Sequence, residues 1–469
     1  MAGFGRKWQT APARSGKSYF MDCDIAVNAR FAVRWILSFG FLFCGIPASK
    51  TQAQEQQVLF ENVNIFNGKS PTLTGPVYVL VSGNIIQTIS PTPIAVEHNV
   101  IKINGAGKTL MPGLIDVHVH MVFGSLSMQD MMSPNISENV IFEKVGVSAH
   151  KMLMRGFTSV RDAGGPIFPL KAAIDGGKIA GPRIWPSGAV ISQTAGHGDF
   201  RTPAEKSRRF FGEPSRAEKL GATFIADGRD EVLTAVRENL RFGASQIKLM
   251  AGGGTSSAYD PVDVTQYTLD EMKAAVQAAE DWGTYVTVHA YTPGAVQRAI
   301  EAGVKCIEHG QLLDEKTLRL MARKKIWLSL QNLVDDTPDM DAQRREKRKP
   351  VIEGQNKVWP MAKKLKVKLA WGTDFLFEPE LNEQQNAFIL RLQKWFTNAE
   401  ILKMVTYDNA QLLQLSGLRS PYQGKLGVVE EGALADLLLV DGDPLSNLSL
   451  IADPAKNFVV IVKNGKLYK

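Results

Sequence analysis

Four of the chain's seven histidines stand where short apolar runs end, and imidazole is a common metal ligand. His118 and His120 are two residues apart, so on a β-strand both rings would project from one face, as a chelating pair requires. His289, His309 and Asp374 stand at the ends of later runs of the same kind. Imidazole and carboxylate together suit zinc or a similar divalent ion. A single His-x-His motif is weak evidence, but these five residues together predict a metal site.

Lys248 lies within another apolar run, residues 246–250, where its ammonium group would be removed from water. Burial disfavours the charged form of a lysine, so the neutral amine is favoured. A neutral amine can add carbon dioxide, and the resulting carbamate can bridge two metal ions. The alternative is a buried lysine paired with Asp374, and the residues alone leave both interpretations open.

These residues need elements that bring them together, and the middle of the chain alternates between strand and helix patterns. Residues 268–283 show the helix pattern, with a Thr-x-x-Glu capping box at the start and Gly283 at the end. Eight such units predict an α/β fold of the (β/α)8 TIM barrel type, with active groups at the carboxyl ends of its strands. A doubly wound open sheet is the alternative. The predicted strands are residues 114–118, 157–162, 183–189, 246–250, 285–290, 305–309, 326–331 and 368–373.

The two ends of the chain show short alternating runs separated by turn residues such as Asn67-Gly68 and Asn464-Gly465. That pattern is typical of antiparallel strands. We therefore expect both ends to pair into one small β-sandwich domain. The predicted domains are a leader at 1–53, the first part of the β-sandwich at 54–110, the barrel at 111–422 and the second part of the β-sandwich at 423–469.

Residues 1–53 have the composition of a secretory signal peptide. They carry seven basic and two acidic residues, whereas the rest of the chain carries 47 and 45, so most of the net charge of +7 lies at the front. An apolar run at 35–46 and then the small-residue site Thr51-x-Ala53 follow the basic residues, which is the order of an export signal. The alternative is a membrane span, but the apolar run is too short for one. Translation starts at Met1 or Met21. We expect export to a bacterial periplasm or the medium, no stable membrane span and no nucleic-acid partner.

The run Leu110–His120 and the other strand-end residues resemble the amidohydrolase superfamily, and the resemblance extends over essentially all of residues 54–469. It is strongest to the imidazolonepropionase-like and Xaa-Pro dipeptidase-like branch of metal-dependent hydrolases, whose members hold two zinc ions. The further matching motifs are Thr158–Gly165, Gly196–Asp199, Lys248–Gly253 and Asp260–Gln266.

The resemblance implies a role for each member of the cluster. Two divalent ions, most simply zinc, would share a bridge formed by N6-carboxylysine at Lys248. Asp374 would also pass a proton from the attacking water to the leaving amine. A homo-oligomer is implied as well. The implied ligands are His118, His120 and Asp374 for one ion and His289 and His309 for the other.

Residues outside the metal set have less specific interpretations. By the resemblance, His197 would contact the substrate carbonyl and stabilise an oxyanion; a solvated loop histidine is the alternative. Tyr259 and Tyr291 are candidates to line the pocket, with rim or core packing as the alternative. Arg161 would pair with neighbouring acids or bind a substrate carboxylate.

Other polar features have a structural interpretation. We expect His98 and His150 to be structural or exposed, and the basic stretch 344–349 to be a solvated helix–loop surface. The long segment 196–226 would cover the barrel mouth or form a subunit contact.

The predicted activity is hydrolysis of an amide bond next to a C-terminal amino acid, as in a dipeptidase or carboxypeptidase. N-acyl aromatic amino acids such as ochratoxin-type amides belong to the same class of small-molecule substrate. A two-metal lactonase and a one-metal deaminase or imidazolonepropionase are alternatives. Thr292 stands where such deaminases carry a glutamate, and this counts against them. A non-catalytic binding protein on the same fold is the remaining alternative.

Overall fold

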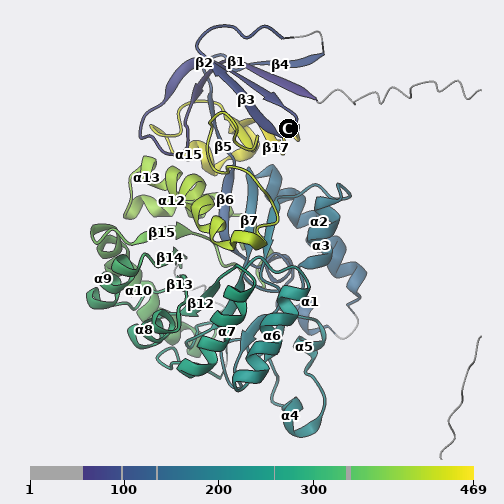
Figure 1. The fold of residues 1–469 in the computed structure, drawn as a ribbon, viewed down its shortest axis with the longest axis vertical. Helices are drawn as coiled ribbons and strands as arrows, with labels where there is room; N and C mark the ends of the chain where they lie inside the picture. Colours follow the sequence, from purple (N-terminus) through teal and green to yellow (C-terminus); the bar gives the residue numbers. More distant parts are fainter. Residues whose placement is uncertain (1–55, 97–98, 134–135, 258, 334–339) are drawn as a thin grey trace, which may run out of the picture. The chain divides into compact units, whose positions relative to one another are not determined.

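All of the predicted barrel strands but the third lie where the sequence predicts them. The computed structural model describes residues 56–96, 99–133, 136–257, 259–333 and 340–469, so the predicted leader lies outside the described residues. Parallel ladders join consecutive strands, and Asp374 N donates to His118 O at 2.8 Å where the last strand meets the first. The α/β barrel is therefore confirmed (Figure 1). Its strands are β6 (Leu114–Val119), β7 (Phe157–Asp162), β8 (Arg183–Pro186), β9 (Val190–Ser192), β11 (Ile247–Met250), β12 (Val286–Ala290), β13 (Cys306–His309), β14 (Trp327–Leu330) and β15 (Lys368–Trp371).

The third predicted strand, 183–189, differs from the prediction because it is interrupted. β8 pairs with β7, whereas β9 pairs with β11, and residues 187–189 separate them. Gly188 has φ +77°, a left-handed conformation that glycine adopts without steric cost and that breaks the extended run. The turn lets the third strand change direction between its two neighbours.

Helices cover the outside of the barrel, and their ends follow local capping rules. Thr268 and Glu271 form the predicted capping box at the start of α7, and Gly283 follows its end with φ +70°. The α-helices are α1 (Met128–Met132), α2 (Glu138–Met154), α3 (Phe168–Asp175), α4 (Arg208–Phe211), α5 (Arg216–Lys219), α6 (Arg229–Arg241), α7 (Leu269–Asp281), α8 (Pro293–Ala302), α9 (Glu315–Lys324), α10 (Ala342–Lys364), α11 (Pro379–Asn382), α12 (Gln385–Arg391), α13 (Asn398–Lys403), α14 (Asn409–Leu413), α15 (Ser449–Ala452) and α16 (Pro454–Asn457). In the part of the chain that the structure describes, no helix combines the length and apolarity needed to cross a membrane.

Both ends of the described chain build one small β domain, as the sequence predicts. β5 pairs antiparallel with β16, with Leu110 opposite Leu439, and this pairing joins the two ends (Figure 1). β4 and β5 run parallel to β1, which the alternating pattern did not predict. The strands are β1 (Gln57–Ile65), β2 (Thr74–Ser82), β3 (Ile85–Ser90), β4 (Val100–Asn104), β5 (Thr109–Pro112), β16 (Leu437–Val440), β17 (Phe458–Lys463) and β18 (Lys466–Leu467).

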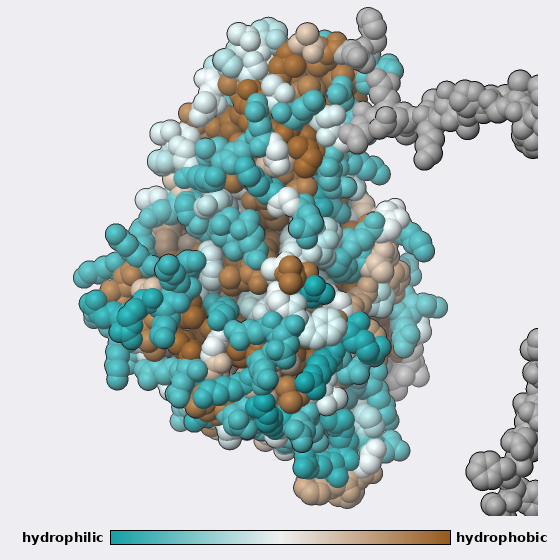
Figure 2. All heavy atoms as spheres, in the orientation of Figure 1, coloured by the Kyte–Doolittle hydropathy of each residue, from teal (hydrophilic) through white to brown (hydrophobic). Residues whose placement is uncertain are grey.

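The segment 196–226 contains more regular structure than the sequence predicts. It holds α4, α5 and a further strand, β10 (Thr223–Ile225), which pairs parallel with β9. Phe210 and Phe211 of α4 are 80% and 60% exposed. The tip that α4 forms is apolar in the space-filling view (Figure 2).

A buried ion pair joins the barrel to the β domain. Arg183 of β8 donates from Nε to Asp436 Oδ2 at 2.8 Å, and its Nη2 donates to Asn464 Oδ1 at 2.7 Å. Asp436 also accepts from the backbone N–H of Asn464 at 2.6 Å. Removing one partner of such a pair leaves a buried charge without compensation.

We expect Asp436→Asn to lower the free energy of unfolding by about 3 kcal/mol, because the buried Arg183 guanidinium loses its anion. Urea denaturation measures this loss. Asp441→Asn is the control, since Asp441 is exposed and its ion pair with Lys108 lies at the surface; its effect should stay below about 0.5 kcal/mol. Equal losses in the two variants would contradict the assignment.

Candidate metal centre and active site

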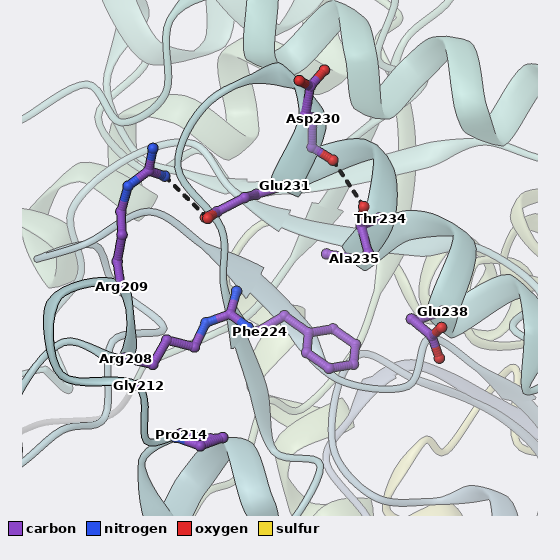
Figure 3. A pocket seen from close by; sticks show the side chains of 10 residues that line it. All are labelled: Arg208, Arg209, Gly212, Pro214, Phe224, Asp230, Glu231, Thr234, Ala235 and Glu238. Carbon is purple, nitrogen blue, oxygen red and sulfur yellow. Dashed lines mark hydrogen bonds and ion pairs between the residues drawn. The ribbon is translucent and has the colours of Figure 1, made fainter. Parts of the chain in front are cut away.

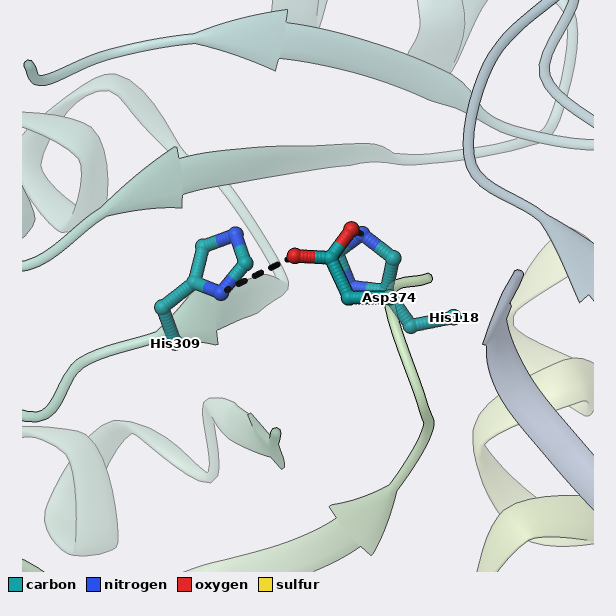
Figure 4. A group of neighbouring side chains, drawn as sticks. All are labelled: His118, His309 and Asp374. Atoms are coloured by element: carbon teal, nitrogen blue, oxygen red, sulfur yellow. Dashed lines mark ion pairs between the residues drawn. The ribbon is translucent and has the colours of Figure 1, made fainter. Parts of the chain in front are cut away.

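Three predicted ligands from distant parts of the chain meet at the carboxyl ends of the barrel strands. His118 belongs to β6, His309 ends β13, and Asp374 follows β15. Asp374 Oδ1 lies 3.2 Å from His118 Nε2, and Asp374 Oδ2 lies 3.9 Å from His309 Nδ1 (Figure 4). One donor atom from each residue falls within 4.8 Å of the others. This spacing fits a single divalent ion.

His120 joins the same carboxylate from the other side. Its Nε2 lies 3.2 Å from Asp374 Oδ1, while its Nδ1 lies 2.9 Å from the carbonyl oxygen of Gly164. A carbonyl accepts only, so the proton of a neutral His120 ring sits on Nδ1 and the lone pair of Nε2 points into the cluster. A carbonyl that accepts from one ring nitrogen in this way orients the other nitrogen of a metal-binding imidazole.

Two members of the cluster have strained backbones. His309 has φ +78° and Asp374 has φ +57°, in the left-handed region that residues with a Cβ seldom adopt. Such strain persists only where the surroundings enforce it, and it concentrates at functional sites. Gly372 makes room nearby, because a Cβ at that position would stand 2.4 Å from His118 N.

Glu308 orients His118, a role that sequence reasoning missed. Glu308 Oε2 lies 2.8 Å from His118 Nδ1, and Arg161 Nη2 donates to Glu308 Oε1 at 2.6 Å. All three side chains are fully buried. Burial would raise the pKa of Glu308, but Arg161 and His118 hold it well below its usual value. The carboxylate therefore stays ionised and fixes the His118 ring with Nε2 toward the cluster.

Arg161 consequently supports the cluster from below, and no substrate carboxylate is needed to pair it. Its Nε donates to Val117 O at 2.5 Å, and Nη1 donates to Tyr285 Oη at 3.0 Å. With Glu308, these contacts surround a guanidinium that is inaccessible to solvent. Of the two roles expected for Arg161, the structure shows the pairing with a neighbouring acid.

Lys248 of β11 reaches the cluster from the barrel interior. It is 1% exposed, and its Nζ lies 3.2 Å from His118 Nε2. Burial lowers the pKa of Lys248 and Arg161 adds to that effect, while Glu308 and Asp374 oppose it. Within the described residues, no ion pair joins Lys248 to Asp374. A buried amine beside a ligand nitrogen is the environment in which the neutral form is favoured.

His289 extends the cluster along β12. Its ring centroid lies 4.4 Å from that of His309 and 4.0 Å from that of His197. Burial holds the pKa values of His289 and His309 well below the usual value of histidine. Both rings are therefore neutral, which is the form that binds metal ions. His289 Nε2 itself lies 3.1 Å from Gly253 O.

His197 lies against this second half of the cluster. It follows β9, is 8% exposed and stacks on His289 with an interplanar angle of 20°. Its Nδ1 lies 2.8 Å from Ser257 Oγ and 3.3 Å from Asp260 Oδ2. The solvated-loop alternative is therefore wrong for His197.

The remaining candidates divide between the site and the surface. The Tyr291 ring is buried, with its centroid 5.0 Å from that of His289 and 5.2 Å from that of His309. Tyr259 is 53% exposed, in the loop after β11. His150 is exposed, as expected, and His98 lies outside the described residues.

The basic stretch 344–349 is solvated on one face only, which corrects the sequence prediction. It forms the first turns of α10, where Arg348 is buried and Lys347 is half-buried. Lys347 Nζ donates to the carbonyl oxygens of Ser257 and Asp260 at 2.8 and 2.7 Å. Positions 344, 347 and 348 share one helix face, so the charge run alone concealed an inward-facing side.

A separate surface cavity lies away from the cluster residues, between α4 and α6. It has a volume of about 570 Å³, and Arg209 pairs with Glu231 across it at 3.0 Å (Figure 3). Segment 196–226 contributes to this cavity through α4. The residues lining it are Arg208, Arg209, Gly212, Pro214, Phe224, Asp230, Glu231, Thr234, Ala235 and Glu238.

A parallel barrel that gathers histidines, a carboxylate and a buried lysine at its strand ends has the architecture of a barrel hydrolase. The chain belongs to the amidohydrolase family, whose sequence profile matches residues 109–468. It is accordingly an enzyme that hydrolyses C–N bonds, in a family that is generally dependent on metal ions.

Individual relatives agree with the branch that the sequence motifs indicated. The ochratoxinase of Aspergillus niger is 31% identical over 372 residues, covering 77% of this chain and 75% of the relative. The crystal structure of an amidohydrolase superposes with a TM-score of 0.79 at 34% identity, covering 88% of this chain and 99% of that chain. The crystal structure of a prolidase complexed with N-methylphosphonate-L-proline gives 0.80 at 32%, covering 88% and 100%.

We expect Glu308→Gln to weaken both the fold and the cluster, because Arg161 loses its buried anion and His118 loses the carboxylate that orients it. The expected cost is about 3–5 kcal/mol of unfolding free energy and about 10–100-fold in metal affinity. Thermal denaturation and competitive chelation measure the two effects. Glu315→Gln, at an exposed helical ion pair, is the control and should alter neither; an unchanged metal affinity in Glu308→Gln would contradict the role.

Proposed function

We propose that this protein is a binuclear metal-dependent hydrolase that cleaves the amide bond next to a C-terminal amino acid. The observation that carries the proposal is the convergence of His118, His120, His309 and Asp374 with buried Lys248 at one end of the barrel. The likeness to an ochratoxinase and to a prolidase supports the choice of an amide bond.

We propose that the donor set holds two divalent ions and that both are zinc. The rings of His289 and His309 are neutral, the carboxylate of Asp374 is ionised, and the buried amine of Lys248 is disposed to react with carbon dioxide. Bound ions would lower the pKa of an attacking water and polarise the scissile carbonyl. His118, His120 and Asp374 would hold one ion, His289 and His309 the other, and carboxylated Lys248 would bridge them.

The chain's own groups would handle the proton and the developing charge. Burial would raise the pKa of Asp374, but His118 and His120 hold it well below its usual value, so its carboxylate is ionised. Asp374 would take that proton from the attacking water and deliver it to the leaving amine. His197 would stabilise the oxyanion that forms on the substrate carbonyl.

We propose dipeptides or N-acyl aromatic amino acids, including ochratoxin-type amides, as the substrate class. Tyr291 is close enough to His289 and His309 to contact a bound substrate, and exposed Tyr259 would contact it from the rim. Either aromatic ring offers an apolar face to the side chain of the C-terminal residue.

The test combines a metal count with a panel of dipeptides, N-acyl amino acids and lactones. We expect two metal ions per subunit, turnover of the amides, and a loss of at least about 100-fold in kcat in Lys248→Ala, because the bridging group is removed. Atomic emission spectroscopy and steady-state kinetics measure both, and exposed Lys316→Ala is the matched control.

The other outcomes are equally informative. Two metal ions with turnover of lactones alone would replace the peptidase assignment with a lactonase. Full activity in Lys248→Ala would eliminate the carbamate bridge. Light scattering on the same sample tests the proposed homo-oligomer.

We also propose that the enzyme is exported to a bacterial periplasm or the medium. The proposal rests on three features of residues 1–53: an excess of basic residues, a short apolar run and a small-residue cleavage site. Expression of the full chain in a bacterium should release protein that begins near Gln54. Cell fractionation and amino-terminal sequencing measure this. An intact amino terminus on cytoplasmic protein would count against export.

A further inference from the structure

His289 and Gly254 confine the ring of His197. The ring stacks on that of His289, with the two centroids 4.0 Å apart. A Cβ at Gly254 would stand 1.9 Å from His197 Cε1, so a larger residue there would displace the ring. These two neighbours restrict the plane of the ring, but they do not select which edge is left free.

Asp260 and Ser257 select that edge. Ser257 Oγ donates its single proton to Asp260 Oδ1, so it can only accept from His197 Nδ1, 2.8 Å away. Asp260 Oδ2 lies 3.3 Å from the same nitrogen. Nδ1 therefore carries a proton and its edge of the ring is fixed; an oxyanion at the other edge would need a second proton, on Nε2, with Asp260 as the counter-charge. Among the described residues, the one hydrogen-bond contact of Nε2 is with Ser256 Oγ, at 3.5 Å.

Asp260 is itself held from several directions. It is 2% exposed and accepts from Gly254 N at 2.8 Å and from Gln266 Nε2 at 3.2 Å. Gln266 Oε1 accepts in turn from His197 N at 2.9 Å. The backbone and the side chain of His197 are thus tied to the same carboxylate.

Lys347 of α10 clamps the loop that carries these groups. Its Nζ donates to Asp260 O at 2.7 Å, Ser257 O at 2.8 Å and Gly254 O at 3.4 Å. Hydrogen bonds from an ammonium group are stronger than neutral ones, and three carbonyls use all three of its protons. The helix after β14 is in this way connected to the loop after β11.

We propose that Asp260 and Lys347 are positioning residues, which hold the His197 ring in one orientation with its Nε2 edge toward the substrate carbonyl. The inference rests on the proposed role of His197 in amide hydrolysis. Neither residue touches substrate; both act through His197. A group misplaced by about 1 Å costs about 100-fold in rate, so loss of the clamp is measurable.

The test is a double-mutant cycle with His197→Ala. In the wild-type background we expect Asp260→Asn to lower kcat about 10–100-fold and Lys347→Met about 5–20-fold, with KM changed less than about threefold. In the His197→Ala background each substitution should cost less than about twofold, because its only route to the reaction is gone. Asp263→Asn and Lys349→Met, at exposed positions of the same loop and helix, are the matched controls.

A second readout needs no substrate. Modification of His197 by diethyl pyrocarbonate, followed by peptide mass spectrometry, should be slow in wild type and both controls and at least about fivefold faster in Asp260→Asn and Lys347→Met, since the ring is released. Equal losses of kcat in both backgrounds, or unchanged reactivity of His197, would overturn the proposal. If the wild-type protein hydrolyses no amide, the proposed function is refuted. The reactivity of His197 with diethyl pyrocarbonate would still test whether Asp260 and Lys347 position its ring.

Discussion

The carboxylate of Glu308 is the interaction on which the rest of the site depends. It lies in the barrel interior between Arg161 and His118 and accepts hydrogen bonds from both. A buried ion pair is tolerated only when its geometry is good and its remaining hydrogen-bonding capacity is used, and Thr287 Oγ1 supplies a further donor here. Fixing Nδ1 of His118 directs Nε2 to the point where Asp374 and Lys248 meet it. The orientation of one ring therefore sets the positions of its neighbours.

Positive φ angles at the strand ends are what allow so many polar groups to share this point. Adjacent residues on a strand face opposite sides, so Glu308 and His309 should not both reach His118. The φ of +78° at His309 ends the alternation and turns its ring toward the cluster, while Glu308 keeps its inward position. The strain costs of the order of 1–3 kcal/mol, and surrounding packing has to offset it.

The same geometry explains what was predictable from the sequence. The barrel strands could be predicted, because hydrophobic runs and helix caps such as Thr268 are local signals. The strand-end histidines could be predicted as site residues, because barrel sites lie at the carboxyl ends of the strands. The role of Glu308 could not be predicted, because strand alternation predicts that its side chain faces away from that of His309. Lys347 was wrongly predicted to be solvated, because the prediction used the charge of the run 344–349 and not its helical spacing. That spacing places positions 344, 347 and 348 on one face of the helix. The short strand β10 carries only three residues, too few for a periodic signal.

Two layers of support thus surround the cluster, one below His118 and one beside His197. The lower layer uses residues of the barrel strands themselves, which are rigid and fully buried. The lateral layer joins a loop after β11 to α10 through Lys347, so a change in either segment reaches His197. Barrel enzymes vary in function through loops that change independently on a constant scaffold. Here two of those loop regions are coupled, so a substitution in α10 must preserve the Lys347 contacts or it also disturbs His197.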